Sequence, residues 1–72
     1  MKNTLDDLRE RFPGQTAIDP EAAGSILDMH AGHVRRLLRD GGLPGVKVGS
    51  RWFIPLTKLA AILDGEADAV HG

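Results

Sequence analysis

The chain has 72 residues, no cysteine and a formal net charge of −1. A chain of this length forms one small domain, and without cysteine it holds neither disulfides nor thiolate metal sites. No apolar run approaches the ~20 residues that a membrane span needs, so we expect a cytoplasmic protein with no membrane partner. The length also leaves little room for a substrate cavity.

The charges are distributed unevenly along the sequence. Residues 1–28 carry three basic and six acidic side chains, whereas residues 29–58 carry six basic side chains and one acid, Asp40. Residues 59–72 add three acids and no base. A basic middle between acidic ends favours contact with a polyanion over a generic solvated surface.

The first predicted element is a short helix within residues 1–12. Leu5, Leu8 and Phe12 are spaced to share one helical face. Thr4 is the expected N-cap, and a Pro-Gly pair ends the segment. We assign residues 1–16 to this accessory helix and its linker, and we expect the helix to pack on the domain or to contact a second copy.

Two helices separated by about three residues follow, an arrangement typical of a helix-turn-helix. The first begins at Asp19, a side-chain acceptor that is followed by proline. Gly24 is expected on its outer side. The second runs over residues 31–40, with His30 at the capping position and a Gly-Gly pair after its end. The residues that the first helix is expected to bury are Ala23, Ile26 and Leu27.

Two short extended runs, residues 46–48 and 52–54, form a predicted β-hairpin. A two-residue loop at Gly49 and Ser50 would divide their apolar side chains between both faces. A three-residue loop would point four apolar side chains inward: Val46, Val48, Trp52 and Ile54. Because a shift of one residue moves a whole apolar set into water, we predict the three-residue loop.

With that loop, Lys47 and Phe53 point outward and Arg51 lies at the tip of the hairpin. A last helix is expected from Leu56 or Thr57. Its buried residues are expected to be Leu59, Ile62 and Leu63. Residues 17–63 then form a winged helix-turn-helix domain, and residues 64–72, which are small and polar, are expected to be a disordered tail.

Three arginines lie opposite the core stripe of the second predicted helix. Val34 and Leu38 mark the core direction, and the far face carries Arg35, Arg36 and Arg39 without a carboxylate among them. A guanidinium group meets a phosphate, or the O6/N7 edge of guanine, with two hydrogen bonds. Gly32 removes side-chain bulk near the helix start, where free backbone N–H groups suit a phosphate. The pattern indicates a DNA-contacting helix.

Metal and catalytic sites are not expected. His30 and His33 are three residues apart, but the only other histidine is His71 in the predicted tail, and there is no cysteine. The sequence shows no serine–histidine–acid set, no paired carboxylates in a plausible pocket and no phosphate-cradling glycine motif. We therefore expect that the protein is not an enzyme and binds no cofactor.

The ordered set of residues from Ala22 to Leu59 resembles the excisionase-type helix-turn-helix family, which is related to the DNA-binding domains of MerR-type regulators. The similarity covers roughly residues 17–63, and its most specific part is the run GGLPGVKVGSRWFIP. The resemblance implies a mostly α fold with a small β-hairpin, a winged helix-turn-helix. The second helix would enter the major groove of DNA and the hairpin, or wing, an adjacent minor groove.

The resemblance also implies the site and the partners. Members are small proteins of phages, plasmids or integrating elements; they bend DNA so that an integrase excises, or they regulate transcription. Many bind adjacent repeats as side-by-side protomers, so the implied partners are double-stranded DNA, an integrase and further copies along the DNA. By position, the implied DNA-binding residues are Ala31, Gly32, His33, Arg35, Arg36, Arg39, Lys47, Ser50 and Arg51.

A second hypothesis is a protein-interaction module or inhibitor built on the same fold. It would use Phe53, Leu56 and the acidic ends against a partner, and it predicts salt-insensitive protein binding without DNA affinity. Within the first hypothesis, excision factors and transcriptional regulators need the same surface, so the sequence leaves both open.

Overall fold

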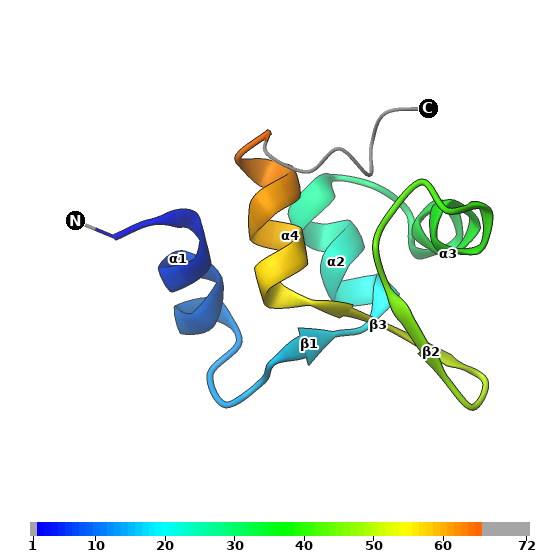
Figure 1. The fold of residues 1–72 in the computed structure, drawn as a ribbon, viewed down its shortest axis with the longest axis horizontal. Coiled ribbons are helices and arrows are strands. Elements are labelled where there is room, and N and C mark those ends of the chain that lie inside the picture. The colour runs from blue at the N-terminus through cyan, green and yellow to red at the C-terminus, as the bar shows by residue number, and fades with distance from the viewer. Residues whose placement is uncertain (1, 66–72) are drawn as a thin grey trace.

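The computed structural model describes residues 2–65, which form four helices and three strands (Figure 1). In chain order these are α1 (Thr4–Arg11), β1 (Ala17–Ile18), α2 (Pro20–Leu27), α3 (Ala31–Asp40), β2 (Val46–Val48), β3 (Arg51–Pro55) and α4 (Leu56–Leu63). The predicted class, a mostly helical winged helix-turn-helix, is confirmed. The strand β1 was not predicted.

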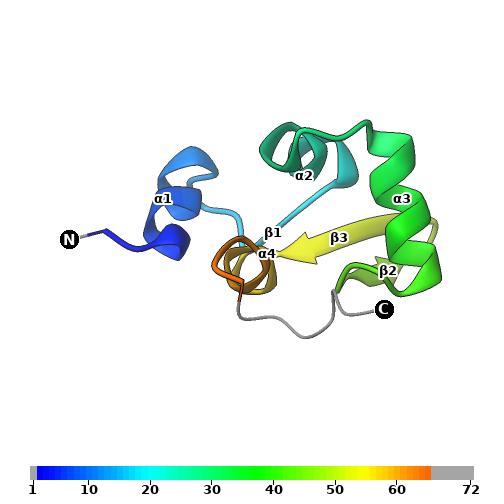
Figure 2. The same ribbon diagram turned by 90° about the horizontal axis from the view of Figure 1, so that it is seen from above.

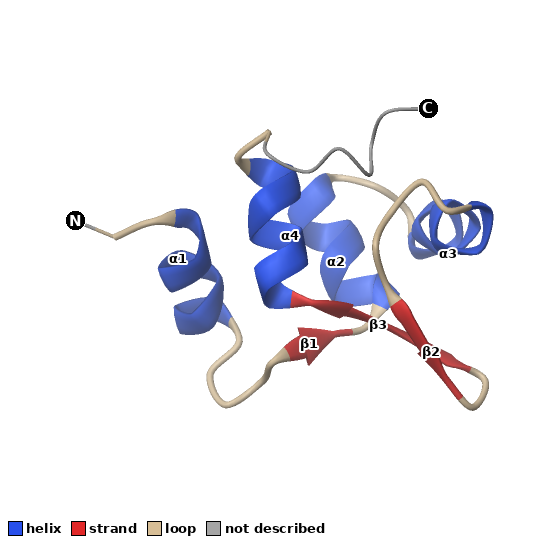
Figure 3. Cartoon of the chain, in the orientation of Figure 1, coloured by secondary structure: helices blue, strands red, loops and turns tan. Residues whose placement is uncertain are grey.

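The three strands form an antiparallel sheet in the order β1-β3-β2, which lies below α2 and α4 in Figure 3. The central strand β3 contacts α2 and α4 as well as both neighbouring strands. Ile18 of β1 pairs with Ile54 of β3, and each is only 1% exposed. The core therefore lies where β1 and β3 meet the helices.

The loop between β2 and β3 has two residues, and the predicted three-residue loop is wrong. Lys47 pairs with Trp52 and Val48 with Arg51, which leaves Gly49 and Ser50 as the loop. Gly49 has a φ of 64°. A glycine with positive φ at the first position of a two-residue loop matches the right-handed twist of paired strands. Arg51 is therefore the first residue of β3 and not a loop residue.

This register changes which side chains face the core. Val46 and Val48 lie on the outer face of the hairpin and are 52% and 61% exposed, against the prediction that they point inward. Lys47, predicted to point outward, shares the inner face with Trp52, and its Nζ lies 5.8 Å from the centroid of the indole ring. The reason is that β2 is an edge strand whose three residues are all exposed, so it has no core to pack against.

The two aromatic residues of β3 point to opposite faces. Trp52 points inward as predicted, although it is only half-buried against the core. Phe53 lies on the outer face as predicted, and it is half-buried beneath Arg51, whose guanidinium carbon is 5.6 Å from the ring centroid.

The helix-turn-helix is formed by α2 and α3, which pack extensively on each other. Asp19 is the N-cap of α2 as predicted, and its Oδ1 accepts a hydrogen bond from the backbone N–H of Ala22 at 2.8 Å. Gly24 is buried, so its predicted outer position is wrong. A Cβ atom at Gly24 would collide with the carbonyl oxygen of Met29 in the turn before α3. The absence of a side chain at Gly24 thus allows α2 and this turn to approach closely.

The N-terminal helix α1 packs on α4, which is one of the two roles expected for it, and its Leu8 is buried. Its N-cap is Asn3 and not Thr4: the side chains of Asn3 and Asp6 each accept a hydrogen bond from the other's backbone N–H, a capping box. Thr4 instead donates its hydroxyl to the carboxylate of Asp64. This hydrogen bond therefore ties α1, near the start of the described chain, to the residue that follows α4, near its end.

Two further predictions concern the end of the chain. Leu63 is 43% exposed, so its predicted burial is wrong, because α4 extends past the core that holds Leu59. The predicted disordered tail lies, from residue 66 onward, outside the described residues. Among residues 2–65, no helix is long and apolar enough to cross a membrane.

Candidate nucleic-acid interface

The exposed face of α3 carries the three arginines that the sequence singled out. Val34 and Leu38 are buried against the core, and Arg35, Arg36 and Arg39 are all exposed. The helix ends at Gly41, whose φ of 85° allows the chain to turn away toward the hairpin. The core stripe of α3 therefore fixes the direction in which its arginines point.

The first turn of α3 is open to contact. His30 is the N-cap as predicted, but its side chain makes no capping hydrogen bond, and the first turn holds no acid. Gly32 and His33 are exposed, Ala31 is half-buried, and a Cβ atom at Gly32 would meet nothing within 4 Å. A helix start with unfilled N–H groups and a positive dipole end favours an anionic group such as a phosphate.

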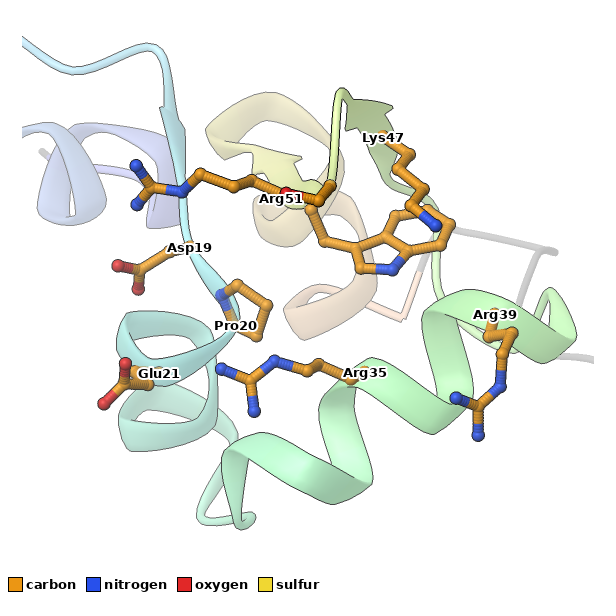
Figure 4. Close-up of a pocket in the computed structure, with 9 residues that line it drawn as sticks. Asp19, Pro20, Glu21, Arg35, Arg39, Lys47 and Arg51 are labelled. Carbon is orange, nitrogen blue, oxygen red and sulfur yellow. The ribbon is translucent and has the colours of Figure 1, made fainter.

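A cleft of about 260 Å³ lies between the start of α2, the side of α3 and the hairpin (Figure 4). It gathers residues from α2, α3, β2 and β3 into one candidate site. The lining residues are Asp19, Pro20, Glu21, Arg35, Arg39, Lys47, Ser50, Arg51 and Trp52.

The cleft joins the two halves of the predicted site. Its lining includes two arginines of α3 and all three predicted residues of the hairpin: Arg35, Arg39, Lys47, Ser50 and Arg51. The remaining predicted residues do not line it, because they lie toward the start of α3 or on its far side: Ala31, Gly32, His33 and Arg36. The site thus consists of a cleft and an adjoining strip of exposed helix.

The cleft is predominantly basic. Arg35, Arg39, Lys47 and Arg51 bring four positive charges to its walls. Within residues 2–65 the only ion pair joins Lys2 to Glu10 at 2.6 Å on the distant α1, so none of these four cations is held in an ion pair. In Figure 2 the end of the molecule formed by α3 and the hairpin lies opposite the end that holds α1.

Four cleft residues were not predicted as part of the site: Asp19, Pro20, Glu21 and Trp52. Trp52 was assigned to the core, and the two-residue loop places it beside Lys47 on the cleft wall. Asp19 and Glu21 were interpreted only as residues that start a helix. They reach the cleft because β1 pairs with β3 immediately before α2, and a two-residue strand gives no periodic signal in the sequence.

Comparison with known proteins gives one match. The sequence model of a family described as a helix-turn-helix domain matches residues 19–67, more than half of the chain. This family contains excisionase-type DNA-binding domains. The match starts at the N-cap of α2 and leaves α1 outside. No curated protein and no solved structure shows significant similarity to the chain. In residues 2–65, no group of three metal-binding side chains is close enough to hold an ion.

Proposed function

Since the chain belongs to the helix-turn-helix domain family, we propose that it recognises specific sequences in double-stranded DNA with α3 and the β2–β3 hairpin. Membership of the family supports a DNA-binding role. The observation that carries the proposal is one basic cleft lined by Arg35 and Arg39 of α3 together with Lys47 and Arg51 of the hairpin, with Arg36 exposed beside it.

In the proposed complex α3 lies in the major groove and the hairpin reaches an adjacent minor groove. In this proposal Arg36, which is exposed and does not line the cleft, reads a base edge, and Arg35 and Arg39 meet bases or phosphates. Gly32 and His33 allow close approach at the helix start. Lys47, Ser50 and Arg51 contact the sugar-phosphate backbone. Residues 17–63 form the DNA-binding unit in this proposal, and residues 1–16 support it.

The resemblance to excisionase-type proteins suggests the biological role. We propose an excision factor (a recombination directionality factor) or a small transcriptional regulator of a mobile element. An integrase and neighbouring copies of the chain on adjacent DNA repeats are its proposed partners. The family is typically non-enzymatic, in line with a protein that acts by binding.

The test is a salt titration of binding to duplex DNA, with random duplex compared with the DNA that flanks the protein's own gene. The wild type should bind the flanking DNA more tightly, with an affinity that falls steeply as salt rises. Replacing Arg35, Arg36 and Arg39 together with alanine should reduce affinity on the order of 100-fold or more while the circular dichroism spectrum stays unchanged.

A matched control removes the same charge from the other end of the molecule. Lys2, Arg9 and Arg11, all exposed on or beside α1, are replaced together with alanine. This variant should retain most of the affinity. DNA binding that survives loss of the three α3 arginines would overturn the assignment of the reading face.

A second candidate function, a protein-binding module, is favoured by the exposed outer face of the hairpin. Val46 and Val48 are more than half exposed beside Phe53, a small apolar patch that suits a protein partner. Leu56, which the sequence suggested for this role, is only 2% exposed and takes no part. This function predicts no duplex binding even at low salt, and protein binding that salt leaves unchanged.

A further inference from the structure

Two carboxylates lie inside the otherwise basic cleft. Asp19 and Glu21 flank Pro20 at the start of α2 and share the cleft lining with Arg35 and Arg51. In Figure 4 both guanidinium groups extend toward the start of α2, that of Arg51 from the hairpin and that of Arg35 from α3. Both acids therefore lie in the cleft that these two cations also line.

The structure of α2 does not require both negative charges. Asp19 caps the helix through the hydrogen bond from the N–H of Ala22, and a neutral asparagine would make the same bond. Glu21 is exposed in the first turn, and its side chain makes no hydrogen bond or ion pair within residues 2–65. Helix capping explains the oxygen of Asp19, and the two charges lie both beside the positive end of the α2 dipole and in the cleft.

We propose that Asp19 and Glu21 restrain DNA binding by competing with backbone phosphates for Arg51 and Arg35. The inference rests on the proposed function, since it concerns the same surface. A carboxylate near an arginine lowers the positive potential that attracts DNA, and it repels a phosphate that enters the cleft.

The restraint acts mainly on the sequence-independent part of the affinity. Binding to any duplex depends on how many phosphates the protein neutralises and on the counterions that this releases. Each carboxylate offsets the charge of one arginine and so lowers by about one the number of phosphates that the protein neutralises. Arg36 does not line the cleft, so the base contacts proposed for it are not offset. Asp19 and Glu21 are thus positioning residues that act through two arginines and make the protein rely on its base contacts.

The test uses the full chain with Asp19→Asn, Glu21→Gln and the double variant, each titrated against random duplex DNA over a range of salt concentrations. Each substitution should tighten binding at low salt by about three- to tenfold. It should also steepen the slope of log K against log[salt] by up to about one unit per carboxylate. A purely structural role would not steepen this slope.

Asp7→Asn is the control, because Asp7 is exposed on α1 and the substitution removes the same charge far from the cleft. It should leave both affinity and slope near the wild-type values. The melting temperature of Asp19→Asn should fall by at most a few degrees, because asparagine keeps the cap and only the charge at the positive end of α2 is lost.

Three outcomes would overturn the proposal. Cleft variants that behave like Asp7→Asn would show that the carboxylates do not affect DNA, and weaker binding would show that they contact DNA favourably. In both cases the wild type still binds duplex, so the proposed function stands. If neither wild type nor variants bind duplex at low salt, the proposed function itself fails.

Discussion

The helix α3 and the β2–β3 hairpin line the same cleft, but different constraints orient their side chains. Along α3, Val34 and Leu38 are buried one turn apart, so the position of every other side chain on the helix follows. The hairpin touches the core only through β3, and every residue of β2 is exposed. Hydrophobic periodicity therefore identifies a functional face only on an element that packs along its length.

On the hairpin the turn sets the register instead. Burying Val46 and Val48 would contribute about 1.5–3 kcal/mol for each side chain if a core lay beside them. Within residues 2–65 no core element covers the outer face of β2, so this gain is not available from the described part of the chain. A two-residue loop with glycine at positive φ suits the twist of the strands, and the valines remain exposed.

The largest effect on stability is expected from Ile54→Ala, which tests where the hairpin joins the core. Ile54 is 1% exposed and pairs with the equally buried Ile18. Its truncation should lower the free energy of unfolding by about 2–5 kcal/mol, measured by urea denaturation followed by circular dichroism. A loss below about 1 kcal/mol would contradict the observed register of β1 and β3.

The next largest effect on stability is expected from substitutions of two helical glycines in the helix-turn-helix. A Cβ atom at Gly24 would collide with the Met29 carbonyl oxygen, whereas one at Gly32 meets nothing within 4 Å. Gly24→Ala should therefore destabilise the protein by about 1–3 kcal/mol despite the better helix propensity of alanine. Gly32→Ala should stabilise it by up to about 1 kcal/mol. Urea unfolding of both variants checks this, and a Gly24→Ala variant that is more stable than the wild type would refute the close approach at Gly24.

The sequence predicted those parts of the fold that local chemistry determines. Asp19, followed by proline, started α2, and the glycine pair after Asp40 ended α3, because caps depend on side chains within one or two turns. The exposed direction of the α3 arginines followed from one buried stripe. These features required no knowledge of distant residues.

The parts that were missed depend on contacts between distant segments. The strand β1 exists through its pairing with β3, and this pairing brings Asp19 and Glu21 to the cleft. The burial of Gly24 reflects the approach of a backbone carbonyl, which no hydrophobic pattern records because glycine has no side chain. The sequence therefore indicated Asp19 and Glu21 only as residues that start a helix, and not as part of the candidate site.

The smallest effect is expected on the outer face of the hairpin, and it separates the two loop registers directly. Val46→Thr and Val48→Thr keep the β-branched shape and place a hydroxyl where the structure has solvent. The double variant should change the free energy of unfolding by no more than about 0.5 kcal/mol per site. In the three-residue register both hydroxyls would enter the core, at a cost of about 1–3 kcal/mol each.

Val34→Thr supplies the matched control, since the same chemical change falls on the fully buried stripe of α3. It should lower the unfolding free energy by about 1–3 kcal/mol in the same urea experiment. If the hairpin variants lost as much stability as Val34→Thr, β2 would be packed along its length as α3 is. The contrast between helix and hairpin would then be wrong. The two-residue register, which places Lys47 beside Trp52 in the cleft, would be refuted with it.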